Sequence, residues 1–344
     1  PHAWHVYRMP AAGGDMERVT DRPSTDTPIH GEDFALSPDG EQLAVLFSRT
    51  NRPPELYLQE ASPEAEPERI THSPTEEWLT YDWRRPEITR FEASDGAQIP
   101  VQIYRPDEPN GAAVWFVHGA GYLQDVTRHW SSFYFREHMF HNLLADLGYT
   151  VLSVAYRGSA GYGRDWRTAV YRHMGGRDLQ DYVDGSRWLA ETREIPADRQ
   201  FIYGGSYGGF MTLMALFEAP ERFAAGAALR SVTDWAHYND PYTSNILNDP
   251  QTDSLAYARS SPIYHAEGLE DPLLMAHGLV DENVQVQDVF RLSQRLIELG
   301  KEDWELATYP AEGHGFEHPS SWTDEYRRIL ELIRSTVGPN RASR

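Results

Sequence analysis

The residues best suited to chemistry lie in the stretch 201–217, which reads FIYGGSYGGFMTLMALF. An apolar run, a glycine-rich turn and a second apolar run predict a strand, a tight turn and a helix. The turn puts Ser206 in a G-x-S-x-G pattern, which at this place is typical of a nucleophile elbow. Gly204 and Gly208 are expected because a Cβ there would collide with the neighbouring strand or helix. The Tyr207 N–H would then point toward a forming oxyanion. A glycine-rich turn with an inert serine is the alternative.

A serine nucleophile needs a general base and an acid that orients the base. In this architecture the acid and then the histidine follow the serine along the chain. Asp281 comes just after a strand predicted at 273–276, and His314 lies in a glycine-rich loop just after a strand predicted at 305–309. Both residues are therefore expected at the same sheet edge as Ser206.

Neighbouring acids and histidines are alternatives for the same roles. Glu282 is adjacent to Asp281 but would point the other way, and Asp271 lies at the opposite end of its strand. His277 is expected to support the strand-end turn, and His318 to lie on the surface at the start of a helix. Asp281 is therefore the favoured acid.

The second oxyanion donor should come from the segment 116–122, which reads FVHGAGY. A backbone N–H near Gly119, the His118 side chain and the Tyr122 side chain are all candidates, and the sequence does not choose among them. A second segment, 228–242, is rich in aromatic residues and must cross the catalytic edge. Some of its rings are therefore expected to wall a flat apolar pocket beside the serine, although core packing is the alternative.

Two further patterns resemble ligand sites. His138 and His141 stand three residues apart on one predicted helix face, but no carboxylate partner completes a metal site. The segment 158–163, GSAGYG, follows a strand, but no helix begins immediately, which favours a strand-end loop over a phosphate site. The sequence therefore predicts no metal and no cofactor.

From residue 87 onward, apolar strands alternate with amphipathic helices, which predicts an α/β fold with a doubly wound, mostly parallel sheet. A leading hairpin around 94–96 would give the sheet an antiparallel edge. The strands are predicted at 88–93, 99–104, 113–117, 150–155, 200–203, 224–229, 273–276 and 305–309. The helices are predicted near 133–147, 178–193, 207–219, 285–299 and 322–335.

The first 72 residues follow another pattern. The segment 5–20 resembles 55–71, about 50 residues later, which is the spacing of propeller blades. Between the copies, 34–47 reads as strand, SPDG turn and strand, a hairpin signal. We therefore predict the C-terminal portion of a β-propeller at 1–72, with too few blades to close, and a linker at 73–86. An autonomous small β-domain is the alternative.

Composition limits the function classes. The net charge of −21 argues against nucleic acid or an anionic membrane as partner. The absence of cysteine excludes disulfides and thiolate metal sites. No apolar run is long enough to span a membrane, and the first residues show neither an initiator Met nor a signal-peptide pattern. The chain is therefore expected to be part of a longer protein.

Five motifs occur together: GGSYGG at 204–209, HGLVDENV at 277–284, EGHGF at 312–316, YRGSAGYG at 156–163 and SPDG at 37–40. This set resembles the prolyl oligopeptidase family of serine peptidases, in its dipeptidyl peptidase IV branch, over nearly the whole chain. The resemblance implies an α/β-hydrolase domain at 87–344 behind a β-propeller. It also implies Ser206, Asp281 and His314 as the catalytic triad, with the Tyr207 N–H in the oxyanion hole.

The same resemblance implies further site residues and a substrate class. An apolar specificity pocket would be formed by Tyr207, Val232, Trp235, Tyr238, Tyr242 and Val284, with Asn283 holding the substrate backbone. His118 stands where this branch has the tyrosine whose side chain completes the oxyanion hole, and Tyr122 follows four residues later. The paired glutamates that grip the substrate amine in this branch would lie on the propeller, and no such segment lies in this chain.

The implied function is hydrolysis of short peptides, after proline or a small apolar residue, through an acyl-enzyme. An acylaminoacyl peptidase or oligopeptidase and an esterase share the same triad, and a non-catalytic interaction protein is a further alternative. Removal of dipeptides or of tripeptides is not distinguished. Short peptides are the expected partners, and a homodimer and a periplasmic or secreted location are hypotheses.

Overall fold

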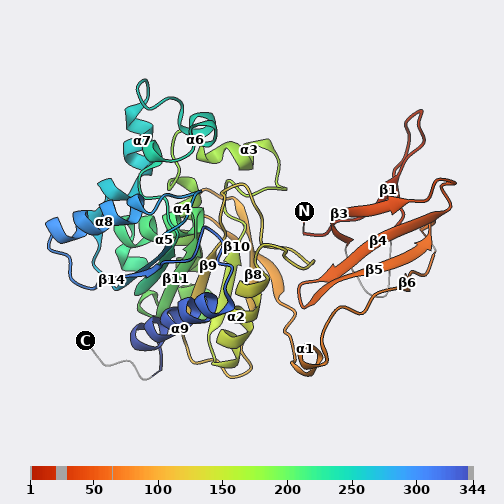
Figure 1. Cartoon of the computed structure of the whole chain (residues 1–344), viewed down its shortest axis with the longest axis horizontal. Helices are drawn as coiled ribbons and strands as arrows, with labels where there is room; N and C mark the ends of the chain where they lie inside the picture. Colours follow the sequence, from red (N-terminus) through yellow and green to blue (C-terminus); the bar gives the residue numbers. More distant parts are fainter. Residues whose placement is uncertain (1, 21–28, 64, 340–344) are drawn as a thin grey trace. The chain divides into compact units, whose positions relative to one another are not determined.

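The computed structural model describes residues 2–20, 29–63 and 65–339 (Figure 1). The chain divides into two compact units. One holds Pro1–Glu87 with Val126–Asn142, and the other holds Ile88–Asp125 with Leu143–Arg344. The return of 126–142 to the first unit was not predicted from the sequence. No helix in the described part of the chain is long and apolar enough to cross a membrane.

The second unit is built on an eight-stranded sheet with the order β14-β13-β12-β11-β9-β10-β8-β7. Neighbouring strands from β14 to β10 run parallel, and β10 pairs antiparallel with β8. The strands are β7 (Glu87–Glu92), β8 (Gln98–Tyr104), β9 (Ala113–Val117), β10 (Thr150–Val154), β11 (Gln200–Gly205), β12 (Ala225–Leu229), β13 (Leu273–Gly278) and β14 (Trp304–Tyr309). The predicted α/β fold with a mostly parallel sheet is confirmed.

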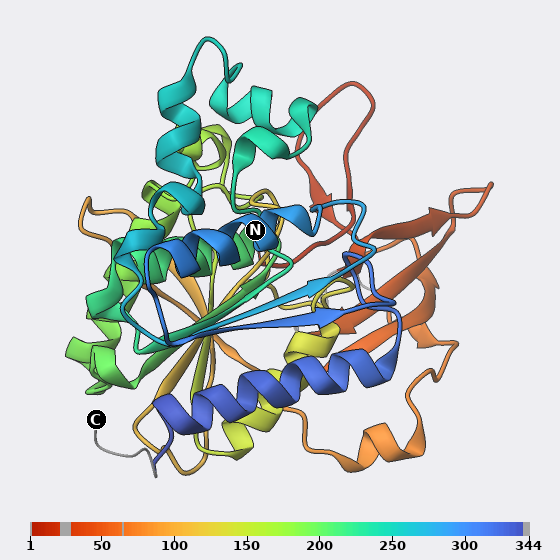
Figure 2. The same cartoon turned by 60° about the vertical axis from the view of Figure 1, so that its left-hand side comes forward.

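Burial explains the sequence pattern of these elements. Strand β9 reads AVWFV and is buried at every position, as expected for a central parallel strand covered on both faces. Helix α5 (Tyr207–Glu218) is apolar all round and buried except for its last residue. Helix α8 (Gln287–Glu298) instead buries only one stripe. Figure 2 shows α9 (Pro319–Thr336) on one face of the sheet and α5 and α8 on the other.

Six further helices lie in the described part of the chain. They are α1 (Glu76–Thr80), α2 (Phe135–Asp146), α3 (Arg164–Arg167), α4 (Arg177–Arg193), α6 (Asp240–Leu247) and α7 (Ser254–Ser260). Short 3-10 helices occur at Thr168–Val170, Ala197–Arg199, Pro220–Arg222, Trp235–His237, Pro262–Tyr264 and Ala266–Gly268. Helices α6 and α7 were missed because eight and seven residues with many polar side chains show no clear apolar period.

The first unit contains an antiparallel sheet of β3 (Ile29–Leu36), β4 (Gln42–Arg49), β5 (Arg52–Glu60) and β6 (Glu68–Arg69). A separate pair joins β1 (Tyr7–Arg8) to β2 (Glu17–Arg18). The repeat seen in the sequence recurs in the pairing, because Tyr7 faces Arg18 as Tyr57 faces Arg69. The structure places α1 within the predicted linker. The propeller assignment and the domain boundaries stay predictions.

Candidate active site

Ser206 stands between the end of β11 and the start of α5, as the elbow pattern predicts. Its backbone has φ 61° and ψ −120°, a region that costs a non-glycine residue of order 1–3 kcal/mol. Two hydrogen bonds hold this conformation: the Ser206 N–H donates to the Leu229 carbonyl at 2.8 Å, and the Phe210 N–H donates to the Ser206 carbonyl at 2.9 Å. The serine is partly exposed although its neighbours in the turn are buried. A strained, exposed serine at a strand–helix turn is suited to nucleophilic attack.

The glycines of the turn are required by close backbone contacts. A Cβ on Gly204 would lie 2.4 Å from the Val117 carbonyl oxygen, and one on Gly208 would lie 2.0 Å from the same atom. The predicted steric reason for these two glycines is therefore confirmed. Gly209 is equally constrained, because a Cβ there would lie 2.2 Å from Ser231 Oγ.

His314 and Asp281 form a hydrogen-bonded pair after β14 and β13. The His314 Nδ1 lies 2.8 Å from Asp281 Oδ2. The other carboxylate oxygen, Oδ1, accepts the N–H groups of Asn283 and Val284, both at 2.9 Å. The carboxylate is thus held on both sides, with one oxygen directed at a partly exposed imidazole. This is the arrangement that orients a general base.

Asp281 is buried but remains ionised. Burial alone would raise its pKa, but hydrogen bonds from His277 and His314 outweigh burial and hold the pKa well below its ordinary value. His277 Nε2 lies 3.3 Å from Asp281 Oδ2 and 2.9 Å from the Val284 carbonyl oxygen. The expectation that His277 supports the strand-end turn is confirmed.

The alternatives to this pair lie elsewhere. Glu282 is exposed, and Asp271 precedes β13 and so lies at its opposite end. His318 is exposed, and its Nδ1 lies 2.7 Å from Glu312 Oε1. Among the residues that the structure describes, no hydrogen bond joins the serine hydroxyl to the His314 ring, and such bonds often tighten only when substrate binds.

The His118 side chain is not available as an oxyanion donor, which corrects one of the three predicted candidates. The side chain is fully buried, and its ring nitrogens contact the Gly119 carbonyl at 3.0 Å and Ser159 Oγ at 2.8 Å. Tyr122 is half-buried, with the Arg167 guanidinium 4.5 Å above its ring. The Tyr122 side chain and the loop backbone therefore remain as candidates.

The aromatic segment forms a packed group beside the elbow. The Trp235 ring lies 5.9 Å from the Tyr242 ring and 5.6 Å from the Tyr238 ring. Trp235 is buried, as are Val232 and Val284, whereas Tyr238 and Tyr242 are only half-buried. The rings of the two tyrosines are therefore partly accessible to solvent, and the buried residues belong to the core.

Polar contacts fix the orientation of both half-buried tyrosines. The Tyr238 hydroxyl donates to Asn283 Oδ1 at 2.8 Å, and the Tyr242 hydroxyl donates to the Ala120 carbonyl oxygen at 3.0 Å. Asn283 is exposed, and its amide nitrogen is directed away from this bond. The aromatic segment 228–242 is thereby tied to the Asp281 loop and to the segment 116–122, the candidate oxyanion loop.

One buried acid near the elbow was missed from the sequence. The Tyr207 hydroxyl donates to Asp178 Oδ2 at 2.6 Å, and both side chains are buried. Burial raises the pKa of Asp178, although hydrogen bonds from Tyr207 and the Gly175 N–H oppose the rise. No sequence signal identifies this contact, because Asp178 lies 29 residues before Tyr207 on another helix.

The histidine pair on α2 is buried. Burial lowers the pKa of His138 to about 4, and burial together with the neighbouring His138 holds the pKa of His141 well below its ordinary value. Within the described residues, no group of three or more His, Asp or Glu side chains is arranged to hold a metal ion.

Comparisons with known proteins show which family this chain resembles. The model of the prolyl oligopeptidase family matches residues 134–340. Dipeptidyl peptidase 8 of Mus musculus is 30% identical, over 98% of this chain and 38% of its own length. A probable dipeptidyl-aminopeptidase B of Sclerotinia sclerotiorum is 27% identical, over 91% of this chain and 34% of its own length.

The fold also has a close structural counterpart. The crystal structure of Porphyromonas gingivalis dipeptidyl peptidase 4 superposes with a TM-score of 0.84, at 22% identity, over 96% of this chain and 46% of that chain. The chain thus spans less than half the length of these relatives. The family match covers more than half of the chain, including the elbow and the Asp–His pair. The chain belongs to the prolyl oligopeptidase family.

Proposed function

We propose that the chain is the catalytic part of a serine peptidase in which Ser206, His314 and Asp281 form the triad. The hydrogen bond between His314 Nδ1 and Asp281, at the same sheet edge as a strained serine, is the observation that carries the proposal. Because Nδ1 donates to the carboxylate, Nε2 keeps its lone pair and can accept a proton.

The proposed reaction is acyl transfer. Ser206 Oγ bonds to the carbonyl carbon of the scissile peptide while its proton passes to His314 Nε2. The same proton then passes to the leaving nitrogen as the C–N bond breaks, which leaves an ester on the serine. Water repeats the sequence and releases the acid. The Tyr207 N–H and the N–H groups of the Gly119–Ala120 turn would stabilise the negative oxygen.

We assign short peptides as substrates, cleaved after proline or a small apolar residue to release dipeptides. The half-buried rings of Tyr238 and Tyr242 support this assignment, because flat rings suit a rigid pyrrolidine. The dipeptidyl peptidase names of the relatives support it independently. An acylaminoacyl peptidase or an esterase would use the same triad, and these differ in their need for a free substrate amine.

The test combines active-site labelling with turnover. A labelled fluorophosphonate should modify the wild-type chain and not Ser206→Ala, while the control Ser293→Ala, a serine on α8, should be labelled fully. Labelling of Ser206→Ala at another residue would contradict the assignment. Turnover of three substrates with the same chromophore would then compare the three activities. A glycyl-prolyl substrate reports dipeptidyl peptidase activity, an N-acetyl-prolyl substrate reports acylaminoacyl peptidase activity, and a simple acyl ester reports esterase activity. Faster turnover of the acetylated substrate would favour the acylaminoacyl alternative.

A homodimer and a periplasmic or secreted location belong to the same proposal. The family assignment is their support. Sedimentation of the purified chain tests the first, and fractionation of the source cells tests the second.

A further inference from the structure

The oxyanion loop contains a fully buried histidine whose two ring nitrogens both have partners. His118 Nδ1 lies 3.0 Å from the Gly119 carbonyl oxygen, and Nε2 lies 2.8 Å from Ser159 Oγ. The ring stacks on Tyr156, with centroids 4.2 Å apart and an interplanar angle of 17°. Because Ser159 and Tyr156 follow β10, these contacts tie the loop after β9 to the loop after the neighbouring strand.

Three contacts bear on the tautomer of His118, because the Tyr156 hydroxyl oxygen also lies 3.2 Å from Nδ1. A carbonyl oxygen can only accept, so the contact with the Gly119 oxygen requires the proton on Nδ1. Nε2 then carries a lone pair, and the Ser159 hydroxyl donates to it. Burial lowers the pKa of His118 to about 4, so the ring is neutral at pH 7. The Tyr156 hydroxyl donates its one proton to the His118 carbonyl oxygen, so toward Nδ1 it can only accept, which agrees with this tautomer. Ser159 supports the same tautomer from the Nε2 side.

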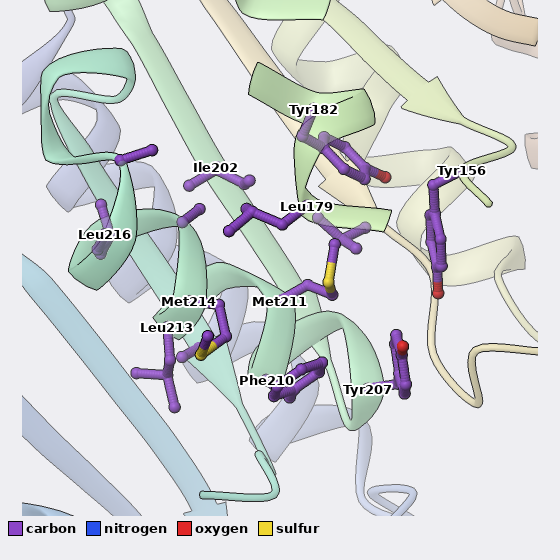
Figure 3. Close-up of a cluster of buried hydrophobic side chains, with 14 of the residues drawn as sticks. Tyr156, Leu179, Tyr182, Ile202, Tyr207, Phe210, Met211, Leu213, Met214 and Leu216 are labelled. Atoms are coloured by element: carbon purple, nitrogen blue, oxygen red, sulfur yellow. The ribbon is translucent and has the colours of Figure 1, made fainter. Parts of the chain in front are cut away.

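Tyr156 holds the preceding peptide group. Its hydroxyl donates to the His118 carbonyl oxygen at 2.9 Å, and both residues are buried. Figure 3 shows Tyr156 beside Tyr207, whose ring is nearly parallel to it at 4° with a centroid distance of 6.0 Å. One tyrosine therefore packs against both the oxyanion loop and the residue that follows the nucleophile.

Because peptide groups are planar, the contacts that hold the His118 and Gly119 carbonyls also fix the directions of the next N–H groups. In a planar trans peptide, the N–H points opposite to the carbonyl of the same group. With the His118 and Gly119 carbonyls held on the buried side, the N–H groups of Gly119 and Ala120 point to the other side. Ala120 is exposed and has φ 59°, and successive N–H groups in such turns form a concavity that binds anions.

This concavity borders the nucleophile elbow. A Cβ on Gly121 would lie 3.1 Å from the Tyr207 ring, so the loop packs directly against the residue that follows Ser206. A Cβ on Gly208 would lie 3.3 Å from the His118 carbonyl oxygen. The loop and the elbow are therefore in contact on both sides of the turn that holds Ser206.

We propose that Ser159 and Tyr156 are positioning residues that act through His118 to aim the backbone N–H groups of Gly119 and Ala120 at the oxyanion. This inference rests on the proposed function. Without the Ser159 hydroxyl, the His118 proton can move to Nε2, and the Gly119 carbonyl loses its donor. Without the Tyr156 hydroxyl, the His118 carbonyl is released. Either peptide group can then rotate and put an oxygen where a donor is needed.

Ser159→Ala and Tyr156→Phe test the proposal, because each removes one hydroxyl and keeps the packing. We expect kcat for a peptide or an ester to fall about 10- to 100-fold, with KM nearly unchanged. This loss is smaller than the roughly 10²- to 10³-fold fall in kcat that follows the removal of a complete oxyanion donor. Donors tuned to oxygen do not stabilise sulfur equally. The preference for an ester over the matched thionoester should therefore fall about tenfold in both variants.

The chain offers matched controls in the same core. The buried Tyr182 donates to the Phe116 carbonyl at 3.0 Å, two residues before His118, and the buried Ser186 donates to a backbone carbonyl at 3.2 Å. Tyr182→Phe and Ser186→Ala should lower thermal stability by similar amounts. They should leave kcat and the ester-to-thionoester ratio within about twofold of the wild type.

The outcomes separate positioning from stability alone. Equal kcat and equal ester-to-thionoester ratios in Tyr156→Phe and Tyr182→Phe would overturn the proposal, as would a raised KM with unchanged kcat. If either test variant is too unstable to assay at 25 °C, Ser159→Thr, which keeps the hydroxyl, should restore activity where Ser159→Val does not, and failure of that rescue would also overturn it. Residual hydrolysis by Ser206→Ala would instead contradict the proposed function.

Discussion

Two buried carboxylates, Asp281 after β13 and Glu55 in β5, accept several hydrogen bonds each but in different surroundings. Glu55 Oε1 accepts from Arg69 at 2.9 Å and from the Ser73 N–H at 2.7 Å, while Oε2 accepts from the Thr71 hydroxyl. All these donors lie within a few residues of one another on the strand paired with β5 and the turn after it. Glu55 therefore fastens one edge of a small sheet.

Asp281 also accepts several hydrogen bonds, but its two oxygens have different kinds of partner. One oxygen is fixed by two backbone N–H groups of its own loop, and the other is directed at His314, 33 residues later and partly exposed. The comparison shows that the number of hydrogen bonds does not distinguish the two carboxylates, so it cannot by itself support the catalytic role that we propose for Asp281. The two carboxylates differ in their partners, because only Asp281 binds a partly exposed imidazole.

The largest expected effect concerns Asp281→Asn. The amide cannot accept the Nδ1 proton in the same way, so the imidazole loses the tautomer that leaves Nε2 free. We expect kcat to fall by about 10⁴, as for the equivalent change in other serine peptidases, with little change in circular dichroism.

Glu55→Gln is the control for that experiment. It replaces a carboxylate of similar burial and should leave kcat within about twofold of the wild type. Comparable losses of kcat in the two variants would mean that both act through general stability, and the comparison would fail.

A smaller effect is expected from Tyr238→Ala, because its half-buried ring is held in place by a hydrogen bond to Asn283 of the Asp281 loop. Removing the ring should lower kcat/KM for a prolyl substrate relative to a generic ester, by about 1–3 kcal/mol or 5- to 150-fold. Tyr238→Phe keeps the ring and should retain most of the prolyl preference. Equal losses on both substrates would assign the ring to the core.

A further test concerns pH and the stability of the first unit. Burial raises the pKa of Glu55, but hydrogen bonds from Thr71, Ser73 and Arg69 outweigh it and lower the pKa from 4.5 to about 2. A carboxyl group whose pKa is lower in the folded chain than in the unfolded chain stabilises the fold. This stabilisation is complete when the pH is above the pKa of the unfolded chain, and it is lost as the pH falls through the pKa of the folded chain.

The smallest expected effect follows from the lowered pKa of Glu55. The wild type should be more stable than Glu55→Gln by about 1 kcal/mol at pH 7, and the difference should shrink between pH 4.5 and pH 2. Urea unfolding, followed by a probe in the first unit, measures this difference. A difference that grows toward acid pH would show that the carboxylate is not stabilised by its donors.

Much of the catalytic framework could be predicted because local rules govern it. The elbow follows from backbone sterics at Gly204, Ser206 and Gly208, where each Cβ is either excluded or placed in a strained turn. The parallel sheet follows from buried apolar runs such as β9, and strand direction then puts Asp281 and His314 at one edge. Short-range patterns thus determine these residues and their side of the sheet.

Other features could not be read from short-range patterns. Helices α6 and α7 lack a periodic apolar stripe, and the return of 126–142 to the first unit depends on contacts far apart in the sequence. The His118 side chain was an oxyanion candidate because its position in the loop allowed it, and only its buried contact with Ser159 excludes it. A side chain's direction depends on what packs around it.

The sequence by itself determined the fold class, the strained serine and the order of acid and histidine, because each depends on residue type and spacing along one chain. Only the tertiary structure decided that Asp281 Oδ2 and His314 Nδ1 come within hydrogen-bond distance, that Asp178 holds Tyr207, and that Tyr156 holds the His118 carbonyl. These contacts join residues that are 29 to 38 positions apart. Burial and hydrogen-bond geometry select them, and neither is encoded in a local pattern.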